Sequence, residues 1–469
     1  MESSLRPLAR PEDLRRQLGA EGVISRFGLS GVVACAVADV KSGLELEAVR
    51  GDMPLPPASV AKALTAVYAM DALGADYRFQ TRLLASAPIR GGILEGDLIL
   101  RGGGDPTLDT DDLATLAAGL KEAGLRELRG QFIVDDSFLP FARTIDAGQL
   151  DHVGYSPSVS GIALNFNRVH FEWKRSGGSY AVTMDARTAR YRPDVSMARM
   201  RVAQRSLPVY TYADKGDFDD WSVARGALGN GGARWLPVRK PALYAGDVFR
   251  TMARAQGLVL PKTTVREGKA AGLQTLVIHN SAPLPVILRG MLKYSTNLTA
   301  EMVGMTASVA RGTPPGSLRG SAQVMSRWAA TELGMTGTSM VDHSGLGSTS
   351  QMTANDLTRA LVRIGQRGIL RPLLKPFVLR GANGREVNPS TLRVDAKTGT
   401  LNYVSGLGGF ITASDGTDMA FAIFTANPEV RKTIRREDSE RPQGARGWNS
   451  RSRRLQSRLI ERWGQIYGS

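Results

Sequence analysis

The stretch "PPASVAKALTAVYAM", residues 56–70, is the part of the sequence that decides the fold and points to the function. Its Ala, Val, Leu, Tyr and Met residues are typical of a buried helix, and Pro57 suits the first helical turn. Lys62 follows Ser59 by three residues, and residues at this spacing share one helix face. The sequence therefore places an ammonium group where burial without a partner is costly, beside a serine hydroxyl.

Chemistry offers a reason for this lysine. A serine hydroxyl is a poor nucleophile until a base removes its proton. Burial or a neighbouring cation lowers the pKa of a lysine from about 10.4, so that the amine can act as this base. The pattern therefore predicts Ser59 as a nucleophile near a helix N-terminus and Lys62 as its general base. The alternative interpretation is a capping serine and a lysine that extends into solvent.

Two further motifs follow in the chain. "KYSTNL" (293–298) contains Ser295 and Asn297, whose side chains would point the same way from a short turn between helices. "DAKTGTL" (395–401) begins a predicted strand, where Lys397 is followed by Thr and Gly and can hold a substrate carboxylate. Each motif alone also fits a polar loop or turn. Together and in this order, on helix, loop and strand, they favour one shared site.

These three motifs are the signature of the penicillin-recognising active-site serine enzymes, which this sequence resembles. The stretch from Ser59 to Ser295 is far longer than that from Asn297 to Lys397, which indicates a domain-sized insertion between the first two motifs. This arrangement resembles the class C low-molecular-mass penicillin-binding proteins, the peptidase S13-like D-alanyl-D-alanine carboxypeptidases/endopeptidases. Further family-like stretches are "LILRGGGDPTL", "FIVDDSF", "ALNFNRV" and "DHSGLG".

The resemblance implies a role for each motif residue. Ser59 would attack the carbonyl between the two terminal D-alanines of a peptidoglycan stem peptide, and Lys62 would accept its proton. Ser295 would relay a proton to the departing amine, and Asn297 would position the substrate amide and the lysine. Lys397 would lower the pKa of Lys62 by like charge and attract the substrate carboxylate. β-Lactams, which mimic the D-alanyl-D-alanine end, would acylate Ser59.

The resemblance also implies groups that bind the substrate. The residues that would hold its carboxylate are Thr398, Gly399 and Thr400, and the backbone N–H groups of Ser59 and Thr400 would form the oxyanion hole. An aspartate of the insertion would contact the amino group of the diamino acid in the stem peptide. In "IVDDSF" this position matches Asp135, with Asp136 as the fallback, although a turn aspartate at a strand end is an alternative. Such a contact would favour endopeptidase action on cross-links as well as carboxypeptidase action.

The predicted fold class is α/β (α+β), a penicillin-binding transpeptidase-like domain with an antiparallel sheet flanked by helices. Strands are expected within residues 30–49 and in three runs between 393 and 428, with helices between. The Gly-rich, strand-like pattern from 166 to 240 indicates a β-rich insertion. The predicted domains are 1–83 with 272–469 (catalytic), 84–165 with 241–271 (inserted) and 166–240 (a small β-rich domain nested in the inserted one).

Composition narrows the kinds of ligand, metal and cofactor that this protein is expected to bind. The 60 Lys and Arg against 44 Asp and Glu give a net charge of +16, which would attract an anionic wall or membrane surface. No nucleic-acid-binding module is found. Four isolated histidines and one cysteine, Cys35, predict neither a metal site nor a cofactor, and Cys35 fits a core thiol. "RGGGDP" (101–106) lacks a Walker lysine and is interpreted as a turn rather than a phosphate site.

Two other functions use the same fold: a β-lactamase, and a non-catalytic cell-wall-binding protein. The complete motifs argue against the second, and the long insertion argues against the first. No serine lies in a Gly-x-Ser-x-Gly elbow, which disfavours an α/β-hydrolase. The chain opens without the apolar segment of a signal peptide. Because stem peptides are processed outside the cytoplasm, a periplasmic or extracytoplasmic location is expected, with a leader that has been removed.

Overall fold

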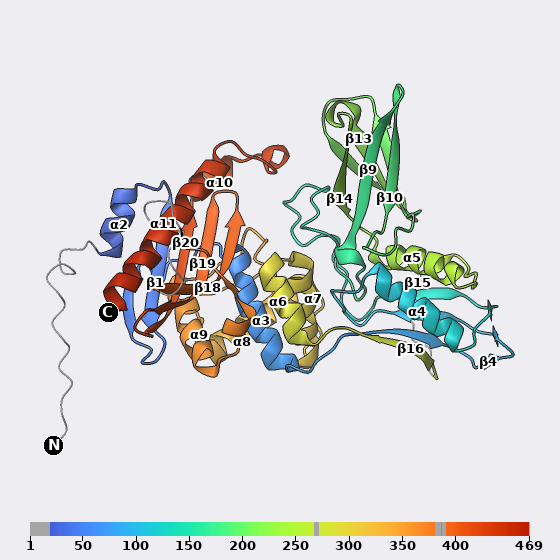
Figure 1. The fold of residues 1–469 in the computed structure, drawn as a ribbon, viewed down its shortest axis with the longest axis horizontal. Helices are drawn as coiled ribbons and strands as arrows, with labels where there is room; N and C mark the ends of the chain where they lie inside the picture. The colour runs from blue at the N-terminus through green and yellow to red at the C-terminus, as the bar shows by residue number, and fades with distance from the viewer. Residues whose placement is uncertain (1–18, 267–271, 380–385, 387–390, 469) are drawn as a thin grey trace, which may run out of the picture.

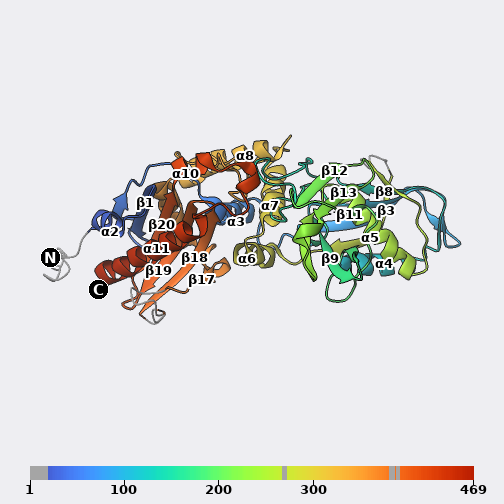
Figure 2. The ribbon, with the colours of Figure 1, turned by 90° about the horizontal axis from the view of Figure 1, so that it is seen from above.

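The computed structural model describes residues 19–266, 272–379, 386 and 391–468. The described chain forms two lobes arranged along one long axis, and both termini lie on the first lobe (Figure 1). The view from above shows the same two lobes, with α6 (Leu284–Tyr294) and α7 (Asn297–Ala310) between them (Figure 2).

The first lobe is built on a six-stranded sheet in the order β17-β18-β19-β20-β1-β2, in which every neighbouring pair is antiparallel. Strands from both ends of the chain meet where β1 pairs with β20. The expected hairpins between the first two strands and between the last two are both present. The strands are β1 (Val32–Asp39), β2 (Glu45–Val49), β17 (Lys375–Pro376), β18 (Leu392–Leu401), β19 (Val404–Ala413) and β20 (Asp418–Ala426).

Helices cover both faces of this sheet, which is why its central strands are continuously apolar. Alternate residues of β1 pack into two different cores: Ala34 and Ala36 face α3 (Ala61–Leu73) and α9 (Ala354–Arg367). Cys35 points to the other face, where α2 (Ala20–Phe27) and α11 (Ala445–Tyr467) pack. Cys35 is fully buried, as expected of a core thiol.

A helical layer completes the first lobe on its inner side. Here α7 packs against α3 and α8 (Leu318–Leu333), and α6 also contacts α3. Both α3 and α7 are buried along most of their length, because they lie in the middle of this layer. Lys62 lies on α3, and its side chain therefore has no access to bulk water.

The second lobe is formed by the insertion. Its five-stranded sheet has the order β15-β8-β6-β3-β16 and mixes parallel and antiparallel pairs, and its core includes side chains of α4 (Thr110–Glu122) and α5 (Pro241–Ala255). The strands of this sheet are β3 (Gln80–Ala85), β6 (Leu98–Arg101), β8 (Phe132–Asp135), β15 (Thr263–Val265) and β16 (Gln274–Asn280). A small sheet of β4 (Ile89–Arg90), β5 (Ile93–Leu94) and β7 (Glu127–Leu128) lies beside it in the sequence.

The β-rich stretch predicted within residues 166–240 forms two three-stranded sheets, β10-β9-β14 and β11-β13-β12. Their strands are β9 (Arg168–Ser176), β10 (Ser179–Asp185), β11 (Ala198–Ala203), β12 (Tyr210–Asp214), β13 (Asp219–Ala224) and β14 (Gly231–Pro237). The division of the chain into three domains stays a prediction. The five-stranded sheet does begin at Gln80 and end at Asn280, a few residues outside the predicted bounds of the insertion.

None of the helices in the described residues is long and apolar enough to cross a membrane.

Candidate active site

Ser59 lies on a short 3-10 turn, η1 (Ala58–Val60), which runs directly into α3. The predicted regular helix from Pro57 therefore begins instead with a tighter turn. Ala58 has φ +47°, a conformation that costs energy for a residue with a side chain and persists only under constraint. The constraint comes from two close glycines. A Cβ on Gly345 would lie 1.9 Å from the carbonyl oxygen of Ala58, and one on Gly399 would lie 2.9 Å from the Ser59 nitrogen.

The Lys62 amine lies in a cage of three oxygen atoms and is fully buried. Its Nζ is 2.9 Å from Ser59 Oγ, 2.7 Å from Asn297 Oδ1 and 2.9 Å from the carbonyl oxygen of Ser344. Two of these partners, the amide oxygen and the backbone carbonyl, can only accept hydrogen bonds. A neutral amine has two N–H groups and one lone pair, so after serving both acceptors its lone pair points at the Ser59 hydroxyl. The geometry therefore suits proton transfer from Ser59 to Lys62.

The other two motifs meet on the opposite side of Ser59. Ser295 caps the end of α6 with φ +57°, and its Oγ accepts a hydrogen bond from Lys397 Nζ at 3.1 Å. Lys397 also donates to the carbonyl oxygen of Thr398 at 2.6 Å and is 2% exposed. Gly399 abuts η1, where any side chain would collide with the Pro57 carbonyl at 2.8 Å. The structure thus brings all three predicted motifs together.

Burial is the main cause of the unusual basicity of both lysines. It lowers the pKa of Lys62 to about 8, against the opposing effect of two buried acids, Glu301 and Asp342. Burial, followed by repulsion from Lys62 and Lys375, lowers the pKa of Lys397 to about 6. Burial is therefore the largest cause at both lysines, and the expectation that the charge of Lys397 also lowers the pKa of Lys62 stays a prediction. Between about pH 6 and pH 8 the two amines together hold one proton, and without substrate this proton is on Lys62.

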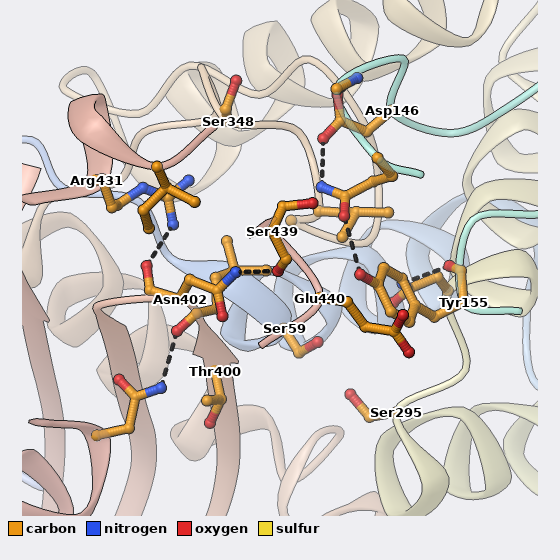
Figure 3. Close-up of a pocket in the computed structure, with 18 residues that line it drawn as sticks. Ser59, Asp146, Tyr155, Ser295, Ser348, Thr400, Asn402, Arg431, Ser439 and Glu440 are labelled. Carbon is orange, nitrogen blue, oxygen red and sulfur yellow. Dashed lines mark hydrogen bonds between the residues drawn. The ribbon is translucent and has the colours of Figure 1, made fainter. Parts of the chain in front are cut away.

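A cleft of about 580 Å³ opens above these groups. Figure 3 shows Ser59 between Thr400 and Ser295, with Glu440 and Tyr155 on the same side as Ser295. Lys62, Lys397 and Thr398 do not line the cleft, because the two amines lie beneath the serines. The residues that line it are Ser59, Asp146, Gly148, Gln149, Tyr155, Ser295, Asn297, Gly345, Leu346, Ser348, Thr400, Leu401, Asn402, Arg431, Ile434, Ser439, Glu440 and Asn449.

Asp135 does not lie where the resemblance placed it. Its carboxylate is buried, forms an ion pair with Arg101 at 2.8 Å and accepts hydrogen bonds from Ser137. Asp135 lines a different cavity, and Asp136 a third one. The acidic residue of the insertion that does line the Ser59 cleft is Asp146. The structure thus does not place Asp135 on the Ser59 cleft, and its role in binding the diamino acid stays a prediction.

A turn at residues 342–347 supports the site and was not given a role from the sequence. Glu301 lies one helical turn after Asn297, and its two carboxylate oxygens accept the backbone N–H groups of His343 and Ser344 at 2.8 and 2.9 Å. This holds the Ser344 carbonyl against Lys62. His343 is fully buried, and burial lowers its pKa to about 3, so it takes no part in a catalytic triad. The i+4 spacing from Asn297 is the sequence signal that would have found Glu301.

The C-terminal segment also contributes to the cleft. Glu440 lines it and binds the insertion, through His152 Nε2 at 2.9 Å and Arg234 at 2.9 Å. Ser439 accepts a hydrogen bond from the Asn402 side chain at the end of β18 through its carbonyl oxygen, at 2.6 Å. The basic tail is thus partly a wall of the site, which no local sequence pattern indicated.

Comparison with known proteins agrees with this arrangement. D-alanyl-D-alanine carboxypeptidase of Actinomadura sp. is 28% identical over 88% of this chain and 81% of its own length. D-alanyl-D-alanine carboxypeptidase DacB of Haemophilus influenzae is 26% identical over 78% of this chain and 79% of its own. The crystal structure of penicillin binding protein 4 from Haemophilus influenzae matches 95% of this chain and all of that one, at 20% identity and a TM-score of 0.77. That likeness confirms the predicted penicillin-binding fold class.

The family model described as the D-Ala-D-Ala carboxypeptidase 3 (S13) family matches residues 27–441, which include all three motifs and both lobes. This chain therefore belongs to the D-Ala-D-Ala carboxypeptidase 3 (S13) family.

Proposed function

We propose that this protein is a serine D-alanyl-D-alanine carboxypeptidase that acts on peptidoglycan stem peptides through an acyl-enzyme on Ser59. The observation that carries the proposal is the buried Lys62 amine, whose two other partners leave its lone pair for Ser59 Oγ at 2.9 Å. Membership of the D-Ala-D-Ala carboxypeptidase 3 (S13) family supports the choice of substrate. Because stem peptides are processed outside the cytoplasm, an extracytoplasmic location is part of this proposal.

In the acylation step, Ser59 Oγ forms a bond to the carbonyl carbon between the two terminal D-alanines, and its proton passes to Lys62. The bond from this carbon to the D-alanine nitrogen then breaks, and the nitrogen takes a proton through the Ser295 hydroxyl, which Lys397 contacts at 3.1 Å. Water attacks the ester in the second step, returns the proton to Ser59 and releases the shortened peptide.

The oxyanion of each tetrahedral intermediate would be held by the backbone N–H groups of Ser59 and Thr400. The close approach of Gly399 to the Ser59 nitrogen supports this, because it brings strand β18 against η1. Preorganised donors of this kind are worth about 10²–10³ in rate each. The strained backbone conformation of Ala58 is the energetic cost of orienting the Ser59 N–H group toward the oxyanion.

Substrate binding would also determine which of the two lysines, Lys62 or Lys397, is protonated. The terminal carboxylate of the peptide favours the charged form of a nearby lysine, and at that end of the cleft Thr400 lines the wall while Lys397 lies beneath it, in contact with Ser295. With one proton shared between the two amines, a carboxylate that holds it on Lys397 leaves Lys62 neutral. The substrate would therefore generate its own general base.

We propose further that Asp146 takes the role first assigned to Asp135 and contacts the amino group of the diamino acid. Its carboxylate is on the cleft wall contributed by the insertion, opposite strand β18. The same cleft would then admit a stem peptide whose diamino acid amine is free and a stem peptide whose diamino acid amine forms a cross-link. Endopeptidase action on cross-links is the corresponding activity.

The acyl-enzyme is tested with a fluorescent penicillin and intact-mass measurement. The wild-type protein is expected to gain one adduct, Ser59→Ala none, and Ser348→Ala, which removes another cleft serine, the same adduct as wild type. An adduct on the Ser59→Ala protein would contradict the proposal. Rapid loss of the adduct with turnover of the penicillin would identify a β-lactamase instead.

Substrate class is tested separately with a stem pentapeptide and a cross-linked peptide dimer. D-alanine is expected from the pentapeptide with wild type, and at a rate reduced by about 10²–10⁴ with Lys62→Ala, which is the usual contribution of general-base catalysis. Asp146→Asn is expected to raise KM for peptides with a free diamino acid amine. An unchanged KM would move that contact away from Asp146.

A further inference from the structure

A second cavity, of about 690 Å³, lies on the inserted lobe and shares no lining residue with the Ser59 cleft. Three arginines line it, Arg78, Arg82 and Arg101, together with a single carboxylate, Asp135. The cavity therefore combines a concave shape with an excess of two positive charges.

The arginines are placed by the strand register. Arg82 on β3 lies directly opposite Arg101 on β6, and Arg101 lies opposite Asp135 on β8. All three side chains thus form one row across one face of the sheet. Like charges directly opposite each other on neighbouring strands are destabilising. A fold has no structural need for such a pair, whereas an anion-binding site does.

Among the three arginines, Arg101 is the one that pairs with Asp135 in the described part of the chain. Asp135 Oδ2 accepts from Arg101 at 2.8 Å, and Oδ1 accepts from the backbone and hydroxyl of Ser137. Arg82 donates to the amide oxygen of Gln80, and Arg78 donates to the backbone carbonyl of Ser281, and both of these acceptors are neutral. Within the described part of the chain, neither Arg78 nor Arg82 forms an ion pair, and both side chains are exposed.

Aromatic side chains complete the cavity. Tyr77 and Phe138 line it, and Phe138 is 37% exposed although it is fully apolar. Guanidinium groups bind planar oxyanions through paired N–H donors. Exposed aromatic rings beside them suit a ligand that also has an apolar face, such as a sugar ring.

We infer that this cavity is a second binding site, for the carboxylates of a peptidoglycan glycan-peptide strand, separate from the cleft where Ser59 acts. The inference rests on the proposed function for the identity of the polymer. The positive charge of Arg78 and Arg82 matches the free carboxylate of the D-glutamate, the second stem residue, and the muramyl sugar beside the first stem residue supplies the ring. Such a site would hold the protein on the wall while the distal end of a stem enters the cleft.

The experiment measures binding by titration calorimetry to the Ser59→Ala protein, so that no step requires catalysis. The probe is N-acetylmuramyl-L-alanyl-D-glutamate, which has two carboxylates and a sugar but no D-alanyl-D-alanine end. Its dimethyl ester and inorganic phosphate are titrated in parallel. The site variant is Arg78→Gln with Arg82→Gln, and the matched control is Arg90→Gln with Arg175→Gln, two exposed arginines elsewhere on the same lobe.

The dicarboxylate is expected to bind, the diester to show at least ten-fold weaker binding, and the affinity to fall with added salt. The site variant is expected to lose at least ten-fold in affinity and the control less than two-fold. Equal losses in both variants, or equal binding of the diester, would overturn the site. Binding of phosphate without the dicarboxylate would overturn the choice of ligand. A failed penicillin test would leave this result standing, because binding is measured without an active Ser59.

Discussion

At the scale of single residues, the site depends on two amines that are basic in water and weakly basic here. Lys62 and Lys397 are both buried from solvent. The hydrogen-bond partners of each amine are neutral oxygen atoms, not carboxylates. Burial of this kind destabilises a charged amine, which lowers the pKa of Lys62 to about 8 and that of Lys397 to about 6. Because the two amines repel each other, the state with a single shared proton is the one able to bind a carboxylate and remove a proton together.

The dependence of activity on pH follows from this shared proton. Below about pH 6 both amines are charged and no base is present, and above about pH 8 both are neutral and no cation holds the carboxylate. We expect kcat/KM for D-alanine release to be bell-shaped between these values, with about a ten-fold loss per pH unit beyond each limb. Initial rates at low substrate from pH 4.5 to 9.5 measure it.

A substitution at Lys375 tests whether the protonation of Lys397 controls the acid limb of the pH profile. Repulsion from Lys375 contributes to the low pKa of Lys397, so Lys375→Met is expected to move the acid limb to higher pH. Lys41→Met removes an exposed lysine on the β1–β2 turn and is expected to leave both limbs in place. A flat profile, or the same shift in both variants, would show that the shared proton does not control the rate.

Glu301 is expected to be essential for the support of the base. In Glu301→Gln one of the two buried N–H groups, of His343 or Ser344, loses its acceptor, which costs about 1–3 kcal/mol of unfolding free energy. The Ser344 carbonyl would shift from Lys62, so kcat is expected to fall as well. Urea unfolding and D-alanine release measure the two effects. Glu332→Gln, at the exposed end of α8, is the control, and equal stability of both variants would contradict the role.

At the scale of elements, the site is assembled by three segments that press on one another. The 342–347 turn, the η1 turn and strand β18 meet around Ala58, and each contact is made through a glycine or a strained residue. Gly345 has φ +76° and lies against the Ala58 carbonyl, which leaves no space for a side chain. The position of the Ser59 nucleophile therefore depends on backbone packing as much as on its own helix.

Gly345→Ala tests this packing. The added Cβ would lie 1.9 Å from the Ala58 oxygen, so η1 must move and acylation by penicillin is expected to slow by at least ten-fold. Gly416→Ala is the matched control, because Gly416 has a similar φ of +88° and no atom within 4 Å of an added Cβ. Both variants pay the left-handed strain of about 1–2 kcal/mol. Only a difference in acylation rate between them supports the packing argument; equal rates would contradict it.

At the scale of the whole molecule, the cleft is a joint product of the two lobes and the tail. Asn297 Nδ2 donates to the Tyr155 carbonyl of the insertion at 2.8 Å, while Oδ1 of the same side chain accepts from Lys62. The Asn297 amide thus connects Lys62 to the second lobe. The tail adds a second link, from Glu440 to His152 and Arg234 and from Arg436 to the Gln149 carbonyl. Breaking the tail's link should loosen one wall without unfolding either lobe.

Hydrogen exchange tests the link. Partly exposed ion pairs contribute about 0.2–1 kcal/mol each, so Glu440→Ala is expected to speed amide exchange in residues 436–444 by a few-fold. Exchange in α9 should not change, because this helix packs on the far side of the sheet. Glu429→Ala removes only an exposed pair with Lys432 in the same segment and serves as control. Equal exchange in the two variants would mean that Glu440 does not fasten the wall.

The sequence by itself determined the chemistry: the Ser59–Lys62 pair, the Ser295–Asn297 turn and the Lys397 strand follow from local spacing, and so do the antiparallel sheet and the insertion. Local patterns suffice there because periodicity and turn residues fix each element nearly independently. Only the tertiary structure decided which distant groups line the cleft. Asp146 and Glu440 line the cleft and Asp135 does not, Glu301 holds the neighbouring turn, and burial is the largest cause of the lowered pKa of Lys62. Burial and long-range contacts are properties of the packed chain, and residues far apart in sequence carry no local signal of them.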